Sequence, residues 1–328
     1  ASSLKYLGSM ITGSGDSSQL GGPIRIAKIT GQVAEYGFLP FLKIMAYISI
    51  SLGLVNLYSL EGNLIVMKLA IESFGTGEPL VLIHGMGSAA TAWKPIIGDL
   101  KNKFKVVTVD LPGHGRTAFS PVQLMDPTSL AQLVMKNLNS LGIENFHLVG
   151  NSLGGWICLE IAASNPEIVK SITALAPAGL WLTPFTSRYP GEVALRFMAS
   201  GVEKVAPSAL NYTWAKKMGF ETVSPRWREL SYELCLDATT AMANSTGYFP
   251  AWDALLGKRF DKQITTSIPI AIIFGDSDHT LPQKTCQERS LAPTHAKWVV
   301  LPQTGHVPMW DSPNEVISEI MATTGVSK

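Results

Sequence analysis

The pentapeptide Gly150-Asn151-Ser152-Leu153-Gly154 has the G-x-S-x-G pattern that presents a nucleophilic serine. It lies between an apolar run, HLVG, and a segment with helical character, LGGWICLEIA. A serine on such a sharp strand-to-helix turn has an exposed Oγ, and the flanking glycines let neighbouring backbone approach. The free N–H groups at the start of the helix favour negative charge there. We therefore predict that Ser152 is the nucleophile of an acyl-transfer reaction.

A base and an acid for this serine can be found late in the chain. Asp276 and Asp278 follow the apolar run IPIAIIF, and His306 follows the run KWVVL. A serine nucleophile needs a base to take its proton, and the base needs a carboxylate to hold its tautomer. We predict that His306 is the base. Both aspartates follow the same predicted strand, so either of them could be the acid.

Backbone donors for the developing oxyanion are expected at two turns. The sequence HGMG closes the run LVLIH, and its Gly-rich turn leaves N–H groups free. The predicted donors are the N–H groups of Met86 and Leu153. We expect His84, and the loop DLPGHGR that begins at Asp110, to be structural rather than catalytic.

The elements that position these residues are short apolar runs that alternate with helical patterns. This alternation is typical of βαβ units, and continuous apolar runs predict parallel strands covered on both faces. The predicted strands are Leu80–His84, Lys105–Asp110, His147–Gly150, Ser171–Leu175, Ile268–Phe274 and Lys297–Leu301. The predicted helices are Ala90–Leu100, Ser129–Leu141, Leu153–Ala163 and Asn314–Met321.

One interval, residues 179–262, carries helical patterns but no strand pattern. It is too long for a loop and is rich in large apolar side chains. We predict a helical cap above the carboxyl edge of the sheet, where open α/β sheets bind ligands. Trp181, Trp214 and Trp252 are its candidate substrate-binding residues.

Composition excludes several classes of function. The 328 residues are 46% hydrophobic and 16% charged, and the net charge of +1 implies no nucleic-acid partner. The mean hydropathy of +0.19 suggests a large core or an apolar pocket. Cys158, Cys235 and Cys286 are sparse and far apart, which argues against disulfides and a zinc site and favours a cytoplasmic setting. We expect no cofactor and no metal, and a small ester as the partner.

The first residues lack the basic and apolar regions of a secretory signal peptide. The most apolar early stretch, residues 38–57, is interrupted by Lys43. The uninterrupted part, about 14 residues, is shorter than the roughly 17–25 needed to cross a bilayer. This stretch is therefore a candidate for weak membrane association.

From about Met67 onward, the sequence resembles the α/β-hydrolase family. The segments HGMG, DLPGHGR, GNSLGG, GDSDHTLP and GHVPMWDSP match its motifs in order. The resemblance implies an α/β-hydrolase fold, with a core of residues 67–178 and 263–328 and a cap of residues 179–262. The family pattern G-x-x-D-x-x-x-P places the catalytic acid at Asp278. It also implies that Ser152 forms an acyl-enzyme, to which His306 delivers water.

The resemblance narrows the reaction without naming one substrate. A serine at position 152 argues against the dehalogenase and epoxide hydrolase branches, which have an aspartate there. We expect hydrolysis of esters with short-to-medium acyl chains. Carbon–carbon hydrolases of aromatic degradation, lactonases and perhydrolases of the same fold remain alternatives. A binding module without activity, and a protein whose function lies in a membrane-bound N-terminus, are rival readings of another class.

Residues 1–66 have a different resemblance. The stretch from LGGPIRIAKITG to LGLVNL resembles the carboxyl-terminal part of a site-2-type membrane metalloprotease. The LDGG segment with its zinc-binding aspartate and the HExxH motif of that family are both missing. We therefore expect an N-terminal, partly helical extension without metal or protease activity. The resemblance suggests a fusion or a cloning junction, with the natural start of the hydrolase near Met67.

Overall fold

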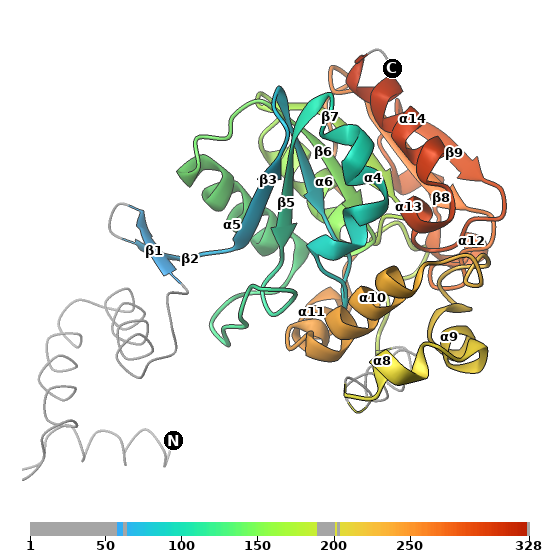
Figure 1. Cartoon of the computed structure of the whole chain (residues 1–328). Coiled ribbons are helices and arrows are strands. Elements are labelled where there is room, and N and C mark those ends of the chain that lie inside the picture. Colours follow the sequence, from blue (N-terminus) through green and yellow to red (C-terminus); the bar gives the residue numbers. More distant parts are fainter. Residues whose placement is uncertain (1–57, 62–63, 189–200, 202–203, 327–328) are drawn as a thin grey trace, which may run out of the picture. The chain divides into compact units, whose positions relative to one another are not determined.

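The computed structural model describes residues 58–61, 64–188, 201 and 204–326 (Figure 1). The chain forms two compact units, residues 1–68 and 69–328. The described part of the first unit is an antiparallel pair, β1 (Tyr58–Glu61) and β2 (Leu64–Met67). The apolar stretch 38–57 and the part of the expected extension before it lie outside the described residues. Within the part that is described, no helix combines the length and the apolar character needed to span a membrane.

The second unit is built on a seven-stranded sheet of order β3-β5-β4-β6-β7-β8-β9. Each predicted strand is confirmed, because each apolar run lies in a buried or half-buried strand of this sheet. The edge strand β3 was not predicted; its sequence AIESF is short and partly exposed, and it pairs antiparallel with β5, whereas all other pairs are parallel. The strands are β3 (Ala70–Phe74), β4 (Glu78–Ile83), β5 (Phe104–Asp110), β6 (Phe146–Asn151), β7 (Val169–Leu175), β8 (Ile270–Gly275) and β9 (Lys297–Leu301).

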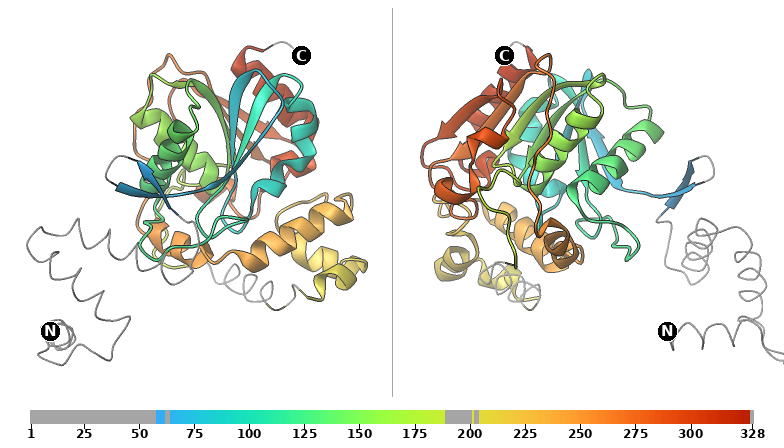
Figure 2. Two further views of the ribbon diagram at one scale, coloured as in Figure 1. Left: turned by 60° about the vertical axis from the view of Figure 1, so that its left-hand side comes forward. Right: turned by 180° about the vertical axis from the view of Figure 1, so that it is seen from behind.

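Helices cover both faces of this sheet, as the continuous apolar strands require (Figures 1 and 2). On one face lie α4 (Lys94–Leu100), which follows the 3-10 turn η1 (Ala90–Trp93), and α14 (Pro313–Thr324). On the other lie α5 (Pro127–Ser140) and α6 (Leu153–Ser164). Helix α5 begins where the Asp126 side chain accepts a hydrogen bond from Ser129 N at 3.2 Å, a normal N-cap.

The interval between β7 and β8 forms the expected helical cap. Its described elements are α8 (Ala206–Ala209), α9 (Thr213–Phe220), α10 (Tyr232–Asn244) and α11 (Tyr248–Leu255), and none of its described residues lies in a strand. Figure 1 shows these helices beyond the end of the sheet toward which the parallel strands point. The remaining elements are α12 (Gln283–Cys286), η2 (Arg289–Leu291) and α13 (Pro308–Asp311).

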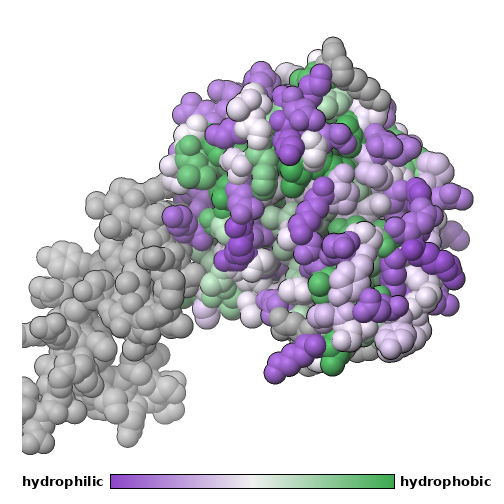
Figure 3. Space-filling view, viewed as in Figure 1, coloured by the Kyte–Doolittle hydropathy of each residue, from purple (hydrophilic) through white to green (hydrophobic). Residues whose placement is uncertain are grey.

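Large apolar side chains fill the interior of the second unit, among them Trp93, Trp156, Phe104 and Phe274, each fully buried. Figure 3 shows that hydrophilic residues predominate on the face seen in Figure 1, with hydrophobic ones between them. The large apolar side chains of this unit therefore form its core.

Candidate active site

Ser152 lies on the sharp turn between β6 and α6, with φ 54° and ψ −116°. A side chain at positive φ costs on the order of 1–3 kcal/mol and persists only where surrounding structure enforces it. The enforcement here is steric: a Cβ on Gly154 would lie 2.0 Å from the Ile83 carbonyl oxygen, and one on Gly150 would lie 2.3 Å from Gly154 O. The glycines of the motif are thus required by backbone packing, as the sequence predicted.

Neighbouring strand β7 holds the backbone of this turn. Ser152 N donates to Leu175 O at 2.9 Å, and Ser152 O accepts from Ala178 N at 3.0 Å. These bonds fix the serine at the carboxyl edge of the sheet.

His306 and Asp278 form a buried pair. Nδ1 of His306 lies 2.9 Å from Oδ2 of Asp278. The other oxygen, Oδ1, accepts from Thr280 N at 2.9 Å and from Leu281 N at 2.8 Å. Because Nδ1–H points at the carboxylate, Nε2 is left as an acceptor, which is the tautomer a general base needs.

Asp276 lies on the same loop but serves a different purpose. Its carboxylate is exposed and accepts from Ser277 Oγ at 2.8 Å and from Thr304 N at 3.4 Å. Its backbone N donates to Leu301 O at 3.0 Å. Asp276 therefore ties its loop to the segment after β9, while Asp278 bonds the imidazole.

Ser152 and His306 line the same cavity, which has a volume of about 280 Å³ and extends between the sheet edge and the cap. None of the described residues that line it is an Asp, Glu, Lys or Arg, and His306 is the one histidine among them. The apolar lining comes from α8, α9, α10 and α13 and the residues beside them, and includes Leu210, Trp214, Met218, Phe220, Met242 and Trp310.

The two predicted oxyanion donors lie beside the nucleophile. Leu153 is the first residue of α6, so its N–H is one of those that have no partner within the helix. Met86 lines the cavity, and its loop is close to the serine, since a Cβ on Gly85 would lie 3.0 Å from Ser152 Cβ.

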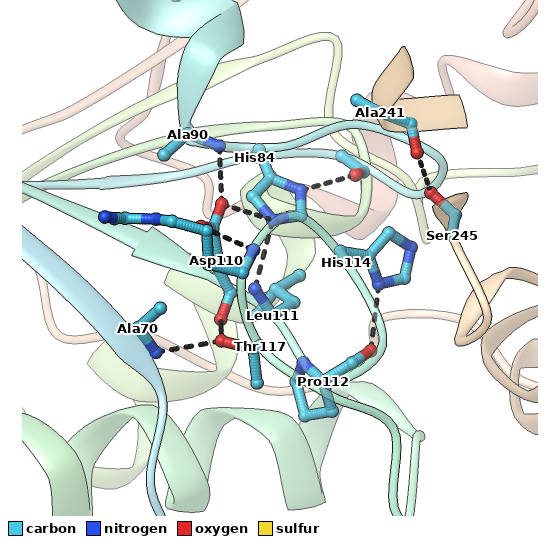
Figure 4. A network of polar contacts seen from close by, with 12 residues as sticks. Ala70, His84, Ala90, Asp110, Leu111, Pro112, His114, Thr117, Ala241 and Ser245 are labelled. Atoms are coloured by element: carbon cyan, nitrogen blue, oxygen red, sulfur yellow. Dashed lines mark hydrogen bonds and ion pairs between the residues drawn. The ribbon is translucent and has the colours of Figure 1, made fainter. Parts of the chain in front are cut away.

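His84 connects this loop to the loop that follows β5 (Figure 4). Its Nδ1 lies 2.7 Å from Gly85 O, and its Nε2 accepts from Leu111 N at 3.0 Å. Burial lowers the pKa of His84, against the opposing field of Asp110, so the ring is neutral. Asp110 in turn accepts from Ala90 N at 2.7 Å. These residues join the HGMG and DLPGHGR loops, the structural task expected of them.

The three predicted tryptophans occupy two different places. Trp214 lines the cavity and is 63% exposed. Trp181 and Trp252 are not among the lining residues; both are buried and pack edge-on against Phe185, with ring centroids 4.9 and 5.6 Å away. Trp181 also packs against Trp156 of α6 at 5.3 Å. These two tryptophans thus belong to a small aromatic core at the base of the cap.

Sequence reasoning missed several residues of the site. Asn151 donates through Nδ2 to Leu175 O at 3.1 Å and to His306 O at 3.0 Å, so it links the serine turn to the base. Its place beside the nucleophile was the only signal. Phe220 lines the cavity without a motif, whereas Trp310 lies within GHVPMWDSP and could have been suspected.

Comparisons with known proteins match two parts of the chain to two different families. Residues 80–320 match the model of the alpha/beta hydrolase family, and residues 1–73 match that of peptidase family M50. A pimeloyl-[acyl-carrier protein] methyl ester esterase of Aeromonas hydrophila is 27% identical over 263 residues, which cover 77% of this chain and 98% of that protein.

Solved structures of similar fold include two with high coverage. A thermophilic esterase from Thermogutta terrifontis has a TM-score of 0.61 and 20% identity, covering 82% of this chain and 96% of its own. Est816, described as an N-acyl homoserine lactone degrading enzyme, has a TM-score of 0.60 and 19% identity, covering 81% and 99%. The family model spans well over half of the chain, and the chain therefore belongs to the alpha/beta hydrolase family.

Proposed function

We propose that this hydrolase cleaves carboxylic esters with short-to-medium acyl chains through an acyl-enzyme on Ser152. His306 is the base and Asp278 the acid that orients it. The observation that carries the proposal is that Ser152 and His306 line one apolar cavity, while Asp278 bonds the imidazole nitrogen Nδ1.

The reaction follows from these positions. Ser152 Oγ attacks the ester carbonyl as its proton passes to Nε2 of His306, and the N–H groups of Met86 and Leu153 bind the oxyanion. Collapse of the tetrahedral intermediate expels the alcohol, which takes the proton from the imidazolium. Water then attacks the acyl-enzyme with His306 again as base, releasing the acid and restoring Ser152.

The lining of the cavity supports an uncharged, apolar acyl group. An anionic acyl part would lose its hydration there without a cation among the described lining residues to replace it. The esterase names of the relatives from Aeromonas and Thermogutta point to the same reaction class.

Lactone hydrolysis is a second candidate, favoured by the fold likeness to Est816. A lactone is a cyclic ester, so the same groups would open it. The carbon–carbon hydrolase alternative is less well supported, because its anionic diketone substrates would lose their hydration in an apolar cavity that offers them no cation among its described lining residues. A perhydrolase would use hydrogen peroxide in place of water at the second step.

A substrate panel tests the proposal. The rates of p-nitrophenyl acetate, butyrate, octanoate and palmitate are measured beside an N-acyl homoserine lactone and a vinylogous diketone, together with labelling by a fluorophosphonate probe. We expect labelling, and the highest kcat/KM on acetate to octanoate. A preference for the diketone over every ester would favour the carbon–carbon alternative, and failure to label would favour a binding module.

A further inference from the structure

A turn of the cap touches the loop that carries the base. The turn comprises residues 223–226 and follows α9, to which it is joined by Val223 N donating to Phe220 O at 3.1 Å. His306 N donates to Val223 O at 2.9 Å. The approach is so close that a Cβ on Gly305 would lie 2.3 Å from that carbonyl oxygen. The base is thus bonded directly to the cap through its own backbone.

Asp311 reinforces this connection. Its Oδ2 accepts from Gly305 N at 2.8 Å, and its Oδ1 accepts from the hydroxyl of Ser224. Its backbone carbonyl accepts from Nη1 of Arg226 at 2.6 Å. Ser224 and Asp311 are 0% and 1% exposed, so a lost partner here would not be replaced by bulk water.

Two further contacts hold His306 from the core. Asn151, beside the nucleophile, donates to the His306 carbonyl oxygen, and Asp278 bonds the imidazole. The core therefore holds the carbonyl group and the imidazole of His306. The cap turn and Asp311 hold the backbone N–H groups of His306 and Gly305. The distance from the imidazole to Ser152 depends on both.

We propose that Asp311 and Ser224 are positioning residues for the base, which couple the cap turn to the location of His306. The proposal rests on the proposed function, since it assumes that His306 acts as base. Phe220, Val223 and Trp310 line the cavity, so the acyl group packs on the same segment that holds the His306 backbone. Loss of the coupling should then appear in kcat rather than in KM.

The test uses the full chain with the variants Ser224→Ala, Asp311→Ala and Asp311→Asn. Ser224→Ala should lower kcat for p-nitrophenyl butyrate by about tenfold, with KM within about twofold, because small displacements of a catalytic group cost rate. Asp311→Ala should cost at least as much. Asp311→Asn keeps an acceptor for Gly305 N–H and can donate to Ser224 Oγ, so it should recover most of the rate.

Ser171→Ala is the matched control. Ser171 is a buried residue of β7, and its Oγ lies 2.8 Å from Nδ1 of His147. It is not among the residues that line the cavity. It should lower the midpoint of thermal unfolding about as much as Ser224→Ala does, yet leave kcat unchanged. The proton NMR signal of the His306–Asp278 hydrogen bond should broaden in Ser224→Ala and stay sharp in Ser171→Ala.

The proposal is overturned if Ser224→Ala is folded and keeps kcat within about twofold of the parent, or if Ser171→Ala loses as much rate. A parent enzyme without activity on any ester would instead refute the proposed function. In that event the NMR comparison still decides the coupling, because it needs no substrate.

Discussion

Ser152, the proposed nucleophile, has a strained backbone that its neighbours enforce. The glycines at positions 150 and 154 admit the backbone of β4 and α6 so closely that the turn cannot relax, and Ser152 is thereby held in the lining of the cavity. Strain of this kind is common at catalytic residues because it presents the reacting atom without further reorganisation.

The nucleophile itself gives the first residue-scale prediction. Ser152→Ala should reduce ester hydrolysis by about 10⁴–10⁶-fold, as removal of the serine does in other serine hydrolases. The fold should be kept, since the backbone conformation is enforced by neighbours and only one oxygen is lost. Rates are measured with p-nitrophenyl butyrate and folding by circular dichroism; activity within tenfold of the parent would show that another group is the nucleophile.

The two aspartates of one loop give a second prediction with its own control. Asp278→Asn should lower kcat by about two to four orders of magnitude, because an amide opposite Nδ1 favours the wrong imidazole tautomer. Asp276→Asn should change kcat far less, since that carboxylate bonds Ser277 and Thr304 at the surface. The reverse ranking of the two kcat values would place the acid at Asp276.

At the scale of elements, the first turn of helix α6 must pack directly against the end of strand β4. A methyl group at position 154 would meet the carbonyl oxygen of Ile83 at 2.0 Å and that of His84 at 2.7 Å. Both atoms belong to backbone, which cannot rotate away as a flexible side chain could.

Gly154→Ala should therefore destabilise the protein by about 3 kcal/mol and reduce activity, because α6 must shift away from β4. Gly98→Ala is the matched control: this glycine lies on the exposed face of helix α4 with open space around its Cα. There alanine should stabilise by about 0.5–1 kcal/mol. Urea unfolding measures both, and equal effects of the two substitutions would contradict the steric account.

At the scale of the whole molecule, buried histidines link stability to pH. Nδ1 of His147 lies 2.8 Å from Ser171 Oγ, and Nε2 lies 3.0 Å from Glu78 Oε2. Burial lowers the pKa of His147, although Glu78 opposes this, and the pKa of His84 is lowered in the same way. The unfolded chain therefore takes up protons first, and the free energy of unfolding should fall as pH drops below about 6.5.

His147→Gln should flatten this dependence, because it removes one of the imidazoles whose pKa burial lowers. Urea unfolding between about pH 7.5 and about pH 5 measures the slope. His279→Gln, a change at an exposed histidine, serves as control and should keep the parent's slope. A parent and a His147→Gln variant with equal slopes would rule out His147 as a source of the pH dependence.

The division into two units leads to a prediction about the extension. Every described residue that lines the cavity belongs to the unit of residues 69–328, as do Asp278 and the described part of the cap. A chain that starts at Met67 should therefore keep kcat within about twofold of the full chain. Activity is measured with p-nitrophenyl butyrate, and loss of activity on truncation would contradict the independence of the hydrolase unit.

The same two chains test the stretch 38–57 by sedimentation with anionic vesicles. If this stretch mediates weak membrane association, only the full chain should sediment with the vesicles.

The sequence by itself determined the fold class and singled out the candidate catalytic residues. The turn at Ser152 depends on glycines within two residues of it, and the strands are continuous apolar runs, so both are local patterns that a sequence displays. The family pattern around Asp278 chose between two aspartates, and the bonds of that carboxylate to His306, Thr280 N and Leu281 N agree with the choice.

Only the tertiary structure decided which side chains meet from distant parts of the chain. Trp181, Trp214 and Trp252 look alike in sequence, yet one lines the cavity and two build a core, because the packing of the cap and not residue type sets their surroundings. The contact of Ser224 with Asp311 joins positions 87 residues apart. Such contacts depend on how the cap settles on the sheet, a result of many weak apolar interactions that no short motif records.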